Sequence, residues 1–279
     1  MKKILITGKD SYIGVSFENY LKESGGLYEI DTADMIDGSW RNQSFADYDA
    51  IFHVAGIAHI KETDQNREFY YKVNRDLAIE TAKKAKADGV KQFVFLSTMS
   101  VYGLNQGVIT PETPKNPVNA YGKSKLMAEN EIAALADDNF TVSVIRPPMV
   151  YGKGCKGNFN TVLKLAGKSP VFPVLKNERS MIFIDNLCEF VKLVIDGNMG
   201  GDFCPQNGSY ICTTDLARLI AKNMGKKVWF SRLFGLPVVL CRPFVGMLQK
   251  AFGNLVYKDF PEYGDYCVCD FESSVKKSV

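Results

Sequence analysis

The first half of the chain alternates short apolar runs with longer stretches in which apolar residues recur at helical spacing. Five apolar runs predict strands, at Lys3–Thr7, Tyr28–Thr32, Ala50–Ala55, Gln92–Ser97 and Thr141–Ile145. The stretches between them predict helices over about 12–24, 67–89 and 119–138. Strands that alternate with helices are typical of a parallel sheet covered on both faces. The pattern therefore predicts an α/β protein with a doubly wound parallel sheet, a Rossmann fold.

The regular alternation stops after Pro147-Pro148, where a loop rich in Gly and Lys follows over residues 151–158. We therefore expect a first domain over residues 1–153, to which a segment of about 180–200 returns. Residues 154–279 would form a smaller C-terminal lobe.

Residues 228–252 are the most ambiguous stretch, because they are apolar yet interrupted by charged residues and prolines. These interruptions argue against a membrane span. The pattern favours amphipathic packing inside the smaller lobe. The alternative is a peripheral, basic surface that faces a membrane. The residues that interrupt the stretch are Arg232, Pro237, Arg242 and Pro243, and the basic surface would use Lys226, Lys227, Arg232, Arg242 and Lys250.

Composition is that of an ordinary globular protein, with 279 residues, 46% of them apolar and 23% charged, enough for a large domain and a smaller lobe. A net charge of +3 is too small for a nucleic-acid groove, so a small-molecule substrate is expected. The apolar run that opens the chain stops at Thr7, too early for a signal peptide, and a cytoplasmic protein is expected. Seven cysteines without a Cys-x-x-Cys pair, with His53 and His59, predict neither disulfides nor a metal site.

A turn punctuated by glycines lies between the first strand and the first helix. Gly8 ends the strand and Gly14 lies six residues on, a spacing that allows a pyrophosphate to approach the helix N-terminus. Ser11 stands where a middle glycine is usual, so an ordinary strand-turn-helix is the alternative. Asp31, 23 residues after Gly8, is expected at the end of the second strand, where a carboxylate accepts both ribose hydroxyls of NAD and repels the 2′-phosphate of NADP. This favours NAD as the cofactor.

Tyr121 and Lys125 stand four residues apart in a predicted helix, which puts both side chains on one face. An ammonium beside a phenol lowers the tyrosine pKa from about 10 towards neutrality. Such a tyrosine acts as an acid or base on a sugar or alcohol hydroxyl. The pair therefore suggests a nicotinamide-dependent enzyme.

Six motifs in order make residues 1 to about 195 resemble the extended short-chain dehydrogenase/reductase superfamily, in its nucleotide-sugar epimerase/dehydratase branch. They are Thr7-Gly-Lys-Asp-Ser-Tyr-Ile-Gly14, His53-Val-Ala-Gly56, Val73-Asn74, Leu96-Ser-Thr-Met-Ser-Val-Tyr-Gly103, Tyr121-Gly-Lys-Ser-Lys125 and Arg146-Pro-Pro-Met-Val-Tyr-Gly152. The resemblance implies a catalytic set of Thr98, Tyr121 and Lys125. It also implies that Asn74 ties two strands together rather than touching substrate.

The same resemblance implies the binding residues. Asp34-Met35 would meet the adenine, Asn158 would contact the sugar diphosphate, and Arg179 would clamp a phosphate oxygen unless it forms a salt bridge between the lobes. The cofactor-binding set is Gly8, Ser11, Tyr12, Ile13, Gly14, Asp31, Asp34, Met35, Ala55, Gly56, Tyr121, Lys125 and Pro148.

The function implied is C4 epimerisation of a UDP-hexose or UDP-N-acetylhexosamine for surface polysaccharide, through a 4-keto intermediate, by a homodimer. Only two residues separate Asp31 from Asp34, a shortening that resembles compact keto-sugar reductases, so NAD(P)H-dependent reduction of a UDP-4-keto-6-deoxy sugar is the alternative. A third possibility is a dinucleotide-binding sensor without catalysis.

Overall fold

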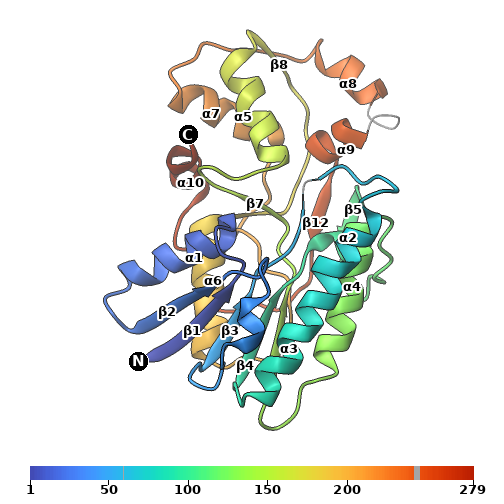
Figure 1. Cartoon of the computed structure of the whole chain (residues 1–279). Coiled ribbons are helices and arrows are strands. Elements are labelled where there is room, and N and C mark those ends of the chain that lie inside the picture. Colours follow the sequence, from blue (N-terminus) through green and yellow to red (C-terminus); the bar gives the residue numbers. More distant parts are fainter. Residues whose placement is uncertain (59, 242–245) are drawn as a thin grey trace. The chain divides into compact units, whose positions relative to one another are not determined.

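The computed structural model describes residues 1–58, 60–241 and 246–279, which its contacts divide into two compact units. The first unit holds residues 1–103, 114–147 and 187–205, and the second holds 104–113, 148–186 and 206–279. Figure 1 shows the chain coloured from the N-terminus to the C-terminus, with most helices and strands labelled. His59, Arg242 and Pro243, named above, lie outside the described residues.

The first unit is built on a six-stranded parallel sheet in the order β10-β6-β4-β3-β1-β2. This confirms the doubly wound α/β fold and all five predicted strands. Its elements are β1 (Lys2–Thr7), α1 (Tyr12–Glu23), β2 (Tyr28–Ala33), β3 (Ala50–His53), α2 (Arg67–Tyr71), α3 (Leu77–Ala87), β4 (Gln92–Leu96), α4 (Ala120–Ala133), β6 (Thr141–Ile145), most of α6 (Ile184–Asp196) and β10 (Gly201–Phe203), with short 3₁₀ turns at Ser39–Asn42 and Met99–Tyr102.

Helices cover both faces of this sheet, as Figure 1 shows. On one face, apolar side chains of α3 and α4 pack on strand residues such as Leu5, Ile51 and Phe93, all of them completely buried. On the other face, Phe17 of α1 meets Phe52 of β3 edge to face, with ring centroids 5.0 Å apart. β3 and β4, in the middle of the sheet, are buried at every position, which explains their apolar sequences.

The helix expected over 67–89 is interrupted by a π-helical turn, Lys72–Asp76, between α2 and α3. Asn74 is fully buried in this turn, and its amide side chain donates to the carbonyl of Ile57 at 3.0 Å and accepts from the Ile57 N–H at 2.8 Å. Asn74 therefore fixes the loop after β3, and not two strands as expected. Insertion of one residue into a helical turn often marks a functional region.

The second unit contains three two-stranded parallel ribbons, β7 with β9, β8 with β11 and β5 with β12, together with its own helices. Its elements are β5 (Gly107–Ile109), β7 (Met149–Tyr151), α5 (Asn158–Lys168), β8 (Val171–Pro173), β9 (Met181–Phe183), α7 (Thr213–Asn223), β11 (Trp229–Ser231), α8 (Gly235–Cys241), α9 (Gly246–Phe252), β12 (Leu255–Tyr257) and α10 (Phe271–Ser278).

The apolar stretch 228–252 is only partly packed. Phe230 and Phe252 meet Phe172 with ring centroids 5.8 and 6.0 Å apart, as the amphipathic interpretation requires. Leu236 and Leu240 of α8, by contrast, are 61% and 73% exposed, so this interpretation is wrong for α8. Among the described residues, every helix is too short or too polar to cross a bilayer.

Candidate functional site

The glycine turn after β1 has the geometry that the sequence indicates. Gly8 has φ of +88°, and a Cβ atom added there would stand 2.8 Å from the Cα of Ala55. Only glycine fits such a backbone and such a close approach. Ser11 caps α1, since its hydroxyl accepts from the Gly14 N–H at 3.2 Å. The residue that breaks the usual glycine pattern thus starts the helix.

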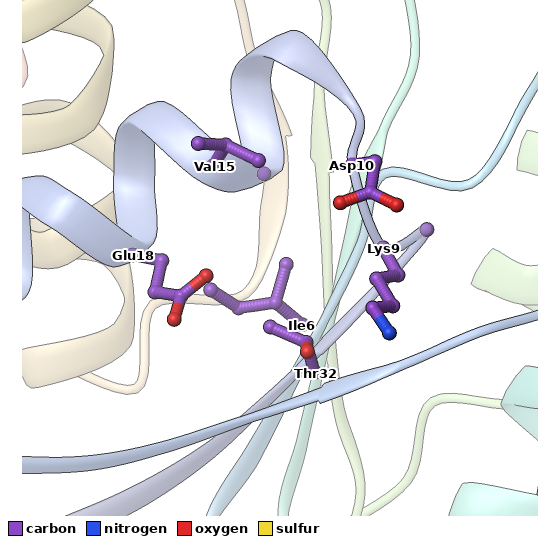
Figure 2. Close-up of a pocket in the computed structure, with 8 residues that line it drawn as sticks. Ile6, Lys9, Asp10, Val15, Glu18 and Thr32 are labelled. Carbon is purple, nitrogen blue, oxygen red and sulfur yellow. The ribbon is translucent and has the colours of Figure 1, made fainter.

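A cavity of about 210 Å³ opens beside this turn, as Figure 2 shows. Thr32 reaches it from β2, Lys9 and Asp10 from the turn, and Val15 and Glu18 from α1. This volume is below the roughly 300–1,000 Å³ of a complete small-molecule site, so it suits one part of an extended ligand.

The residues present fit a dinucleotide. The N-terminus of α1, where Tyr12 and Ile13 are the first residues, offers backbone N–H groups and a positive dipole end, and the bare Gly8 lets a phosphate approach the backbone. Ala55 and Gly56 follow β3 directly, and a Cβ on Gly56 would stand 2.9 Å from the Asn74 side chain. Small residues are therefore required at this strand end.

Asp31 is not at the end of β2, because the strand continues for two more residues to Ala33. Its carboxylate accepts a hydrogen bond of 2.9 Å from the Tyr48 hydroxyl and lies 3.9 Å from Lys3 Nζ. The expected strand-end position of Asp31 is therefore wrong. The first residue after β2 is Asp34, which is exposed.

Asp34 lies beside the glycine turn, since the N–H groups of Gly8 and Lys9 both donate to the carbonyl of Ala33, the residue before it. One oxygen of its carboxylate accepts from the Ile36 N–H at 2.8 Å. Met35, by contrast, is buried in the core beside α3 and α4.

The side chains of Tyr121 and Thr98 lie close enough for Thr98 to act on the pKa of Tyr121. Thr98 follows β4 and caps the 3₁₀ turn Met99–Tyr102. Tyr121 lies in the first turn of α4, whose N-terminus is capped by Asn119 through the Gly122 N–H at 2.8 Å. The Glu62 carboxylate adds a second cap by accepting from the Ala120 N–H at 2.8 Å.

Lys125 lies one turn further along α4, as its spacing from Tyr121 predicts. It is 5% exposed, and its ammonium donates to the Leu96 carbonyl at 2.9 Å and stands 4.6 Å from the centre of the Phe95 ring. Burial lowers the pKa of Lys125 to about 8, although the carboxylate of Glu129 opposes this change.

The pKa of Tyr121 is raised and not lowered as the sequence suggested. Burial is the main cause, and the hydrogen bond with Thr98 opposes it. The ammonium of Lys125 is directed at the Leu96 carbonyl, so Thr98 is the residue that favours the phenolate.

Glu129 occupies the next turn of α4 and is 2% exposed. It accepts from the hydroxyl of Ser97 and forms a two-pronged ion pair with Arg146, at 2.8 and 3.0 Å. Arg146 also pairs with Asp202 at 2.7 Å. Both carboxylates raise the pKa of Arg146 against the effect of burial. Glu129 was not among the residues expected at the site, although it stands four residues after Lys125 in the sequence.

His53 is completely buried and structural. Its Nδ1 is 2.9 Å from the hydroxyl of Thr7, and burial, with a smaller effect of Lys125, lowers its pKa to about 3. The ring is therefore neutral and joins the ends of β1 and β3.

Pro148, Asn158 and Arg179 belong to the second unit. Pro148 is buried just before β7. Asn158 begins α5, whose N-terminus has no side-chain cap and so leaves backbone N–H groups for a ligand.

Arg179 is 7% exposed, and its guanidinium donates to the Gly253 carbonyl at 2.9 Å. Its Nε has no hydrogen-bond partner, and no carboxylate pairs with it among the residues that the structure describes. Burial lowers the pKa of Arg179 to about 10, still well above neutral pH. A buried cation without a counter-ion suits a phosphate oxygen.

Comparisons with known proteins agree with this geometry. A model described as the NAD dependent epimerase/dehydratase family matches residues 4–203, so the chain belongs to this family of NAD-dependent enzymes, as its motifs suggested. A UDP-glucose 4-epimerase of Vibrio cholerae is 29% identical, over 89% of this chain and 87% of its own length.

Two further comparisons are informative. The N-acetyl-alpha-D-glucosaminyl-diphospho-ditrans,octacis-undecaprenol 4-epimerase of Escherichia coli O157:H7 is 27% identical, over 68% of this chain and 62% of its own length. A solved dTDP-4-dehydrorhamnose reductase of Clostridium acetobutylicum has a TM-score of 0.68 and 24% identity, over 82% of each chain. At this identity the reductase shows a shared fold alone. Membership of an enzyme family removes the sensor without catalysis from consideration.

Proposed function

We propose that the chain catalyses C4 epimerisation of a UDP-hexose or UDP-N-acetylhexosamine through a 4-keto intermediate, as a step in making precursors of surface polysaccharide. The observation that carries this proposal is the proximity of Thr98, after β4, to Tyr121 of α4, with the buried Lys125 one helical turn further along. Both curated relatives described above are named as 4-epimerases, which supports the assignment.

The chain's own groups would carry the proton. Tyr121 takes the proton of the sugar 4-hydroxyl and later returns it, while the hydroxyl of Thr98 donates a hydrogen bond to the same oxygen. Lys125, one turn further along α4, would position the cofactor ribose. NAD, when bound, supplies the hydride acceptor and donor for C4 of the sugar.

The proposed cofactor-binding residues lie at or just after the ends of β1, β2 and β3. The glycine turn, with Ser11, Tyr12, Ile13, Ala55 and Gly56, would hold the cofactor phosphates and the adjoining ribose. We assign the adenosine ribose to Asp34 and not to Asp31, because Asp34 ends β2 beside the glycine turn and Asp31 is engaged by Tyr48.

The second unit would hold the rest of the ligands. Arg179 would bind a phosphate oxygen of the sugar nucleotide, and Asn158 would contact the same diphosphate from the N-terminus of α5. Pro148 would line the nicotinamide side of the cofactor.

A homodimer formed through α2, α3 and α4 is also proposed, supported by the exposed apolar side chains of Phe69 and Met127 on α2 and α4. We place the enzyme in the cytoplasm, since its substrates would be nucleotide sugars. Sedimentation velocity of the wild type and of Phe69→Glu tests the dimer, and an unchanged monomer in both would reject it.

Reduction of a UDP-4-keto-6-deoxy sugar is the second candidate. Only Thr32 and Ala33 separate Asp31 from Asp34, a shortening that resembles compact keto-sugar reductases and favours this candidate. The two reactions differ in the cofactor, since an epimerase regenerates it in every cycle and a reductase must release it.

Release of nucleotide from freshly purified protein separates the two. About one NAD per chain, together with interconversion of C4-epimeric UDP-sugars, supports epimerisation. Protein without nucleotide that oxidises NADPH only with a 4-keto sugar supports reduction.

Tyr121→Phe tests the catalytic assignment in either case. Loss of the proton carrier should lower kcat by roughly 10²–10⁴ while NAD binding is retained. Tyr28→Phe is the control. Tyr28 begins β2, away from the glycine turn, and its hydroxyl donates to the carboxylate of Asp196. Undiminished turnover in Tyr121→Phe would reject the assignment.

A further inference from the structure

An exposed apolar surface surrounds α8 in the second unit. Val239 and Leu240 stand three and four residues after Leu236, so the three side chains lie on one side of the helix. They are 44%, 73% and 61% exposed, respectively. Figure 1 shows α8 at the edge of its unit. We call the following residues the α8 surface: Trp229, Leu233, Phe234, Leu236, Val239 and Leu240.

The backbone under this surface is held in place. β11 pairs with β8, and Phe230 lies inward against Phe172 while its neighbour Trp229 is 66% exposed. Gly235 is buried, and a Cβ atom added there would stand 2.7 Å from the carbonyl of Val174. The apolar side chains are therefore presented to solvent by a packed framework. Clusters of this kind on a folded unit mark an interaction site.

The segment that contains α8 carries only positively charged side chains. Residues 216–258 contain eight Lys or Arg and no Asp or Glu, in a protein whose net charge is only +3. Four of these cations are exposed next to the α8 surface in the sequence, namely Lys226, Lys227, Arg232 and Lys250. An apolar helix face flanked in the sequence by exposed basic residues is typical of a helix that lies in a bilayer interface.

We propose that the α8 surface docks the protein on an anionic lipid bilayer. Leucine, phenylalanine and tryptophan side chains would enter the boundary between headgroups and acyl chains, while the basic residues contact lipid phosphates. A second copy is a poorer occupant, because a two-fold interface brings each residue near its own counterpart and would oppose basic clusters. Docking on the bilayer would not depend on turnover or on the identity of the sugar.

Trp229 is a built-in reporter of docking. The chain has two tryptophans, and Trp40 is 1% exposed in the first unit, so its emission should not respond to lipid. The full-length protein is titrated with vesicles of phosphatidylcholine alone and with vesicles that contain about 30% phosphatidylglycerol. We expect a blue shift and co-sedimentation with the anionic vesicles, at least about tenfold weaker binding to the neutral ones, and weakening by salt.

Matched variants locate the contact. Leu236→Glu with Leu240→Glu should weaken binding at least about tenfold, because two charges enter the interface. Leu27→Glu adds one such charge at a leucine of the first unit that is 62% exposed and should bind as the wild type does, whereas Leu240→Glu alone should weaken binding. If the double Glu variant does not fold, as judged by circular dichroism, Leu236→Ala with Leu240→Ala replaces it.

Three results would overturn the proposal. They are no binding to anionic vesicles, equal binding of the α8 variant and Leu27→Glu, or self-association that the α8 variant abolishes without any lipid binding. Tyr121→Phe should still bind vesicles, which separates this proposal from the proposed catalysis.

Discussion

Replacement of Lys125 by Met tests how strongly burial penalises its ammonium. In the folded chain the pKa of Lys125 falls from 10.5 to about 8 because the side chain is buried. The folded-state pKa is lowered, so the unfolded chain binds the proton more tightly between these two values. The penalty is fully present below about pH 8 and is relieved as the pH rises towards 10.5.

The size of the penalty follows from the pKa difference. At about 1.4 kcal/mol per pKa unit, Lys125 opposes folding by about 3 kcal/mol at pH 7. Most of this, about 2 kcal/mol, should disappear between pH 8 and pH 10. Met has a similar shape and cannot titrate, so the variant lacks this pH dependence.

Urea unfolding of both proteins at intervals from pH 7 to pH 10 measures the effect. The free energy of unfolding of the wild type should rise relative to that of Lys125→Met by about 2 kcal/mol from pH 8 to pH 10. Lys123→Met, in which an exposed lysine of α4 is replaced, should follow the wild type. A constant difference between the wild type and Lys125→Met across this range would refute the reasoning.

Three further outcomes are expected. Asp34→Asn should weaken NAD binding, measured by isothermal titration, about tenfold more than Asp31→Asn does, and equal losses would contradict the ribose assignment. Glu129→Gln should lower the free energy of unfolding by about 3 kcal/mol, because Arg146 loses its buried partner, and a loss below about 1 kcal/mol would show that the pair is dispensable. Gly8→Ala should cost about 2 kcal/mol or more and weaken NAD binding, and a melting temperature equal to that of the wild type would count against the required close approach.

Periodicity and spacing were enough to predict the sheet and the helix that carries the catalytic pair. Among the predicted strands, β1, β3 and β4 contain uninterrupted apolar runs, whereas β10 has only the residues Gly201–Phe203 and no such run. The π-helical turn at Lys72–Asp76 keeps helical spacing on both sides, so the sequence contains no break that would signal it.

Two errors concern properties that depend on tertiary surroundings. The apolar pattern of β2 does not distinguish a strand that ends at Thr32 from one that reaches Ala33, and this small difference decides which acid meets the turn. The pKa of Tyr121 depends on burial and on where the Lys125 ammonium points, and neither can be read from a spacing of four. The apolar sequence of α8 likewise does not reveal that its leucines are exposed, because an apolar segment is usually buried.

The attachment of α4 to the end of β4 has a consequence for how this enzyme can diversify. Glu129, Lys125 and Tyr121 contact Ser97, Leu96 and Thr98, respectively, from three successive turns of one helix. The packing of one helix, α4, on the end of β4 thus sets the distance between the side chains of Tyr121 and Thr98. New sugar preferences can therefore arise by drift at distant positions while the proton-transfer pair keeps its alignment.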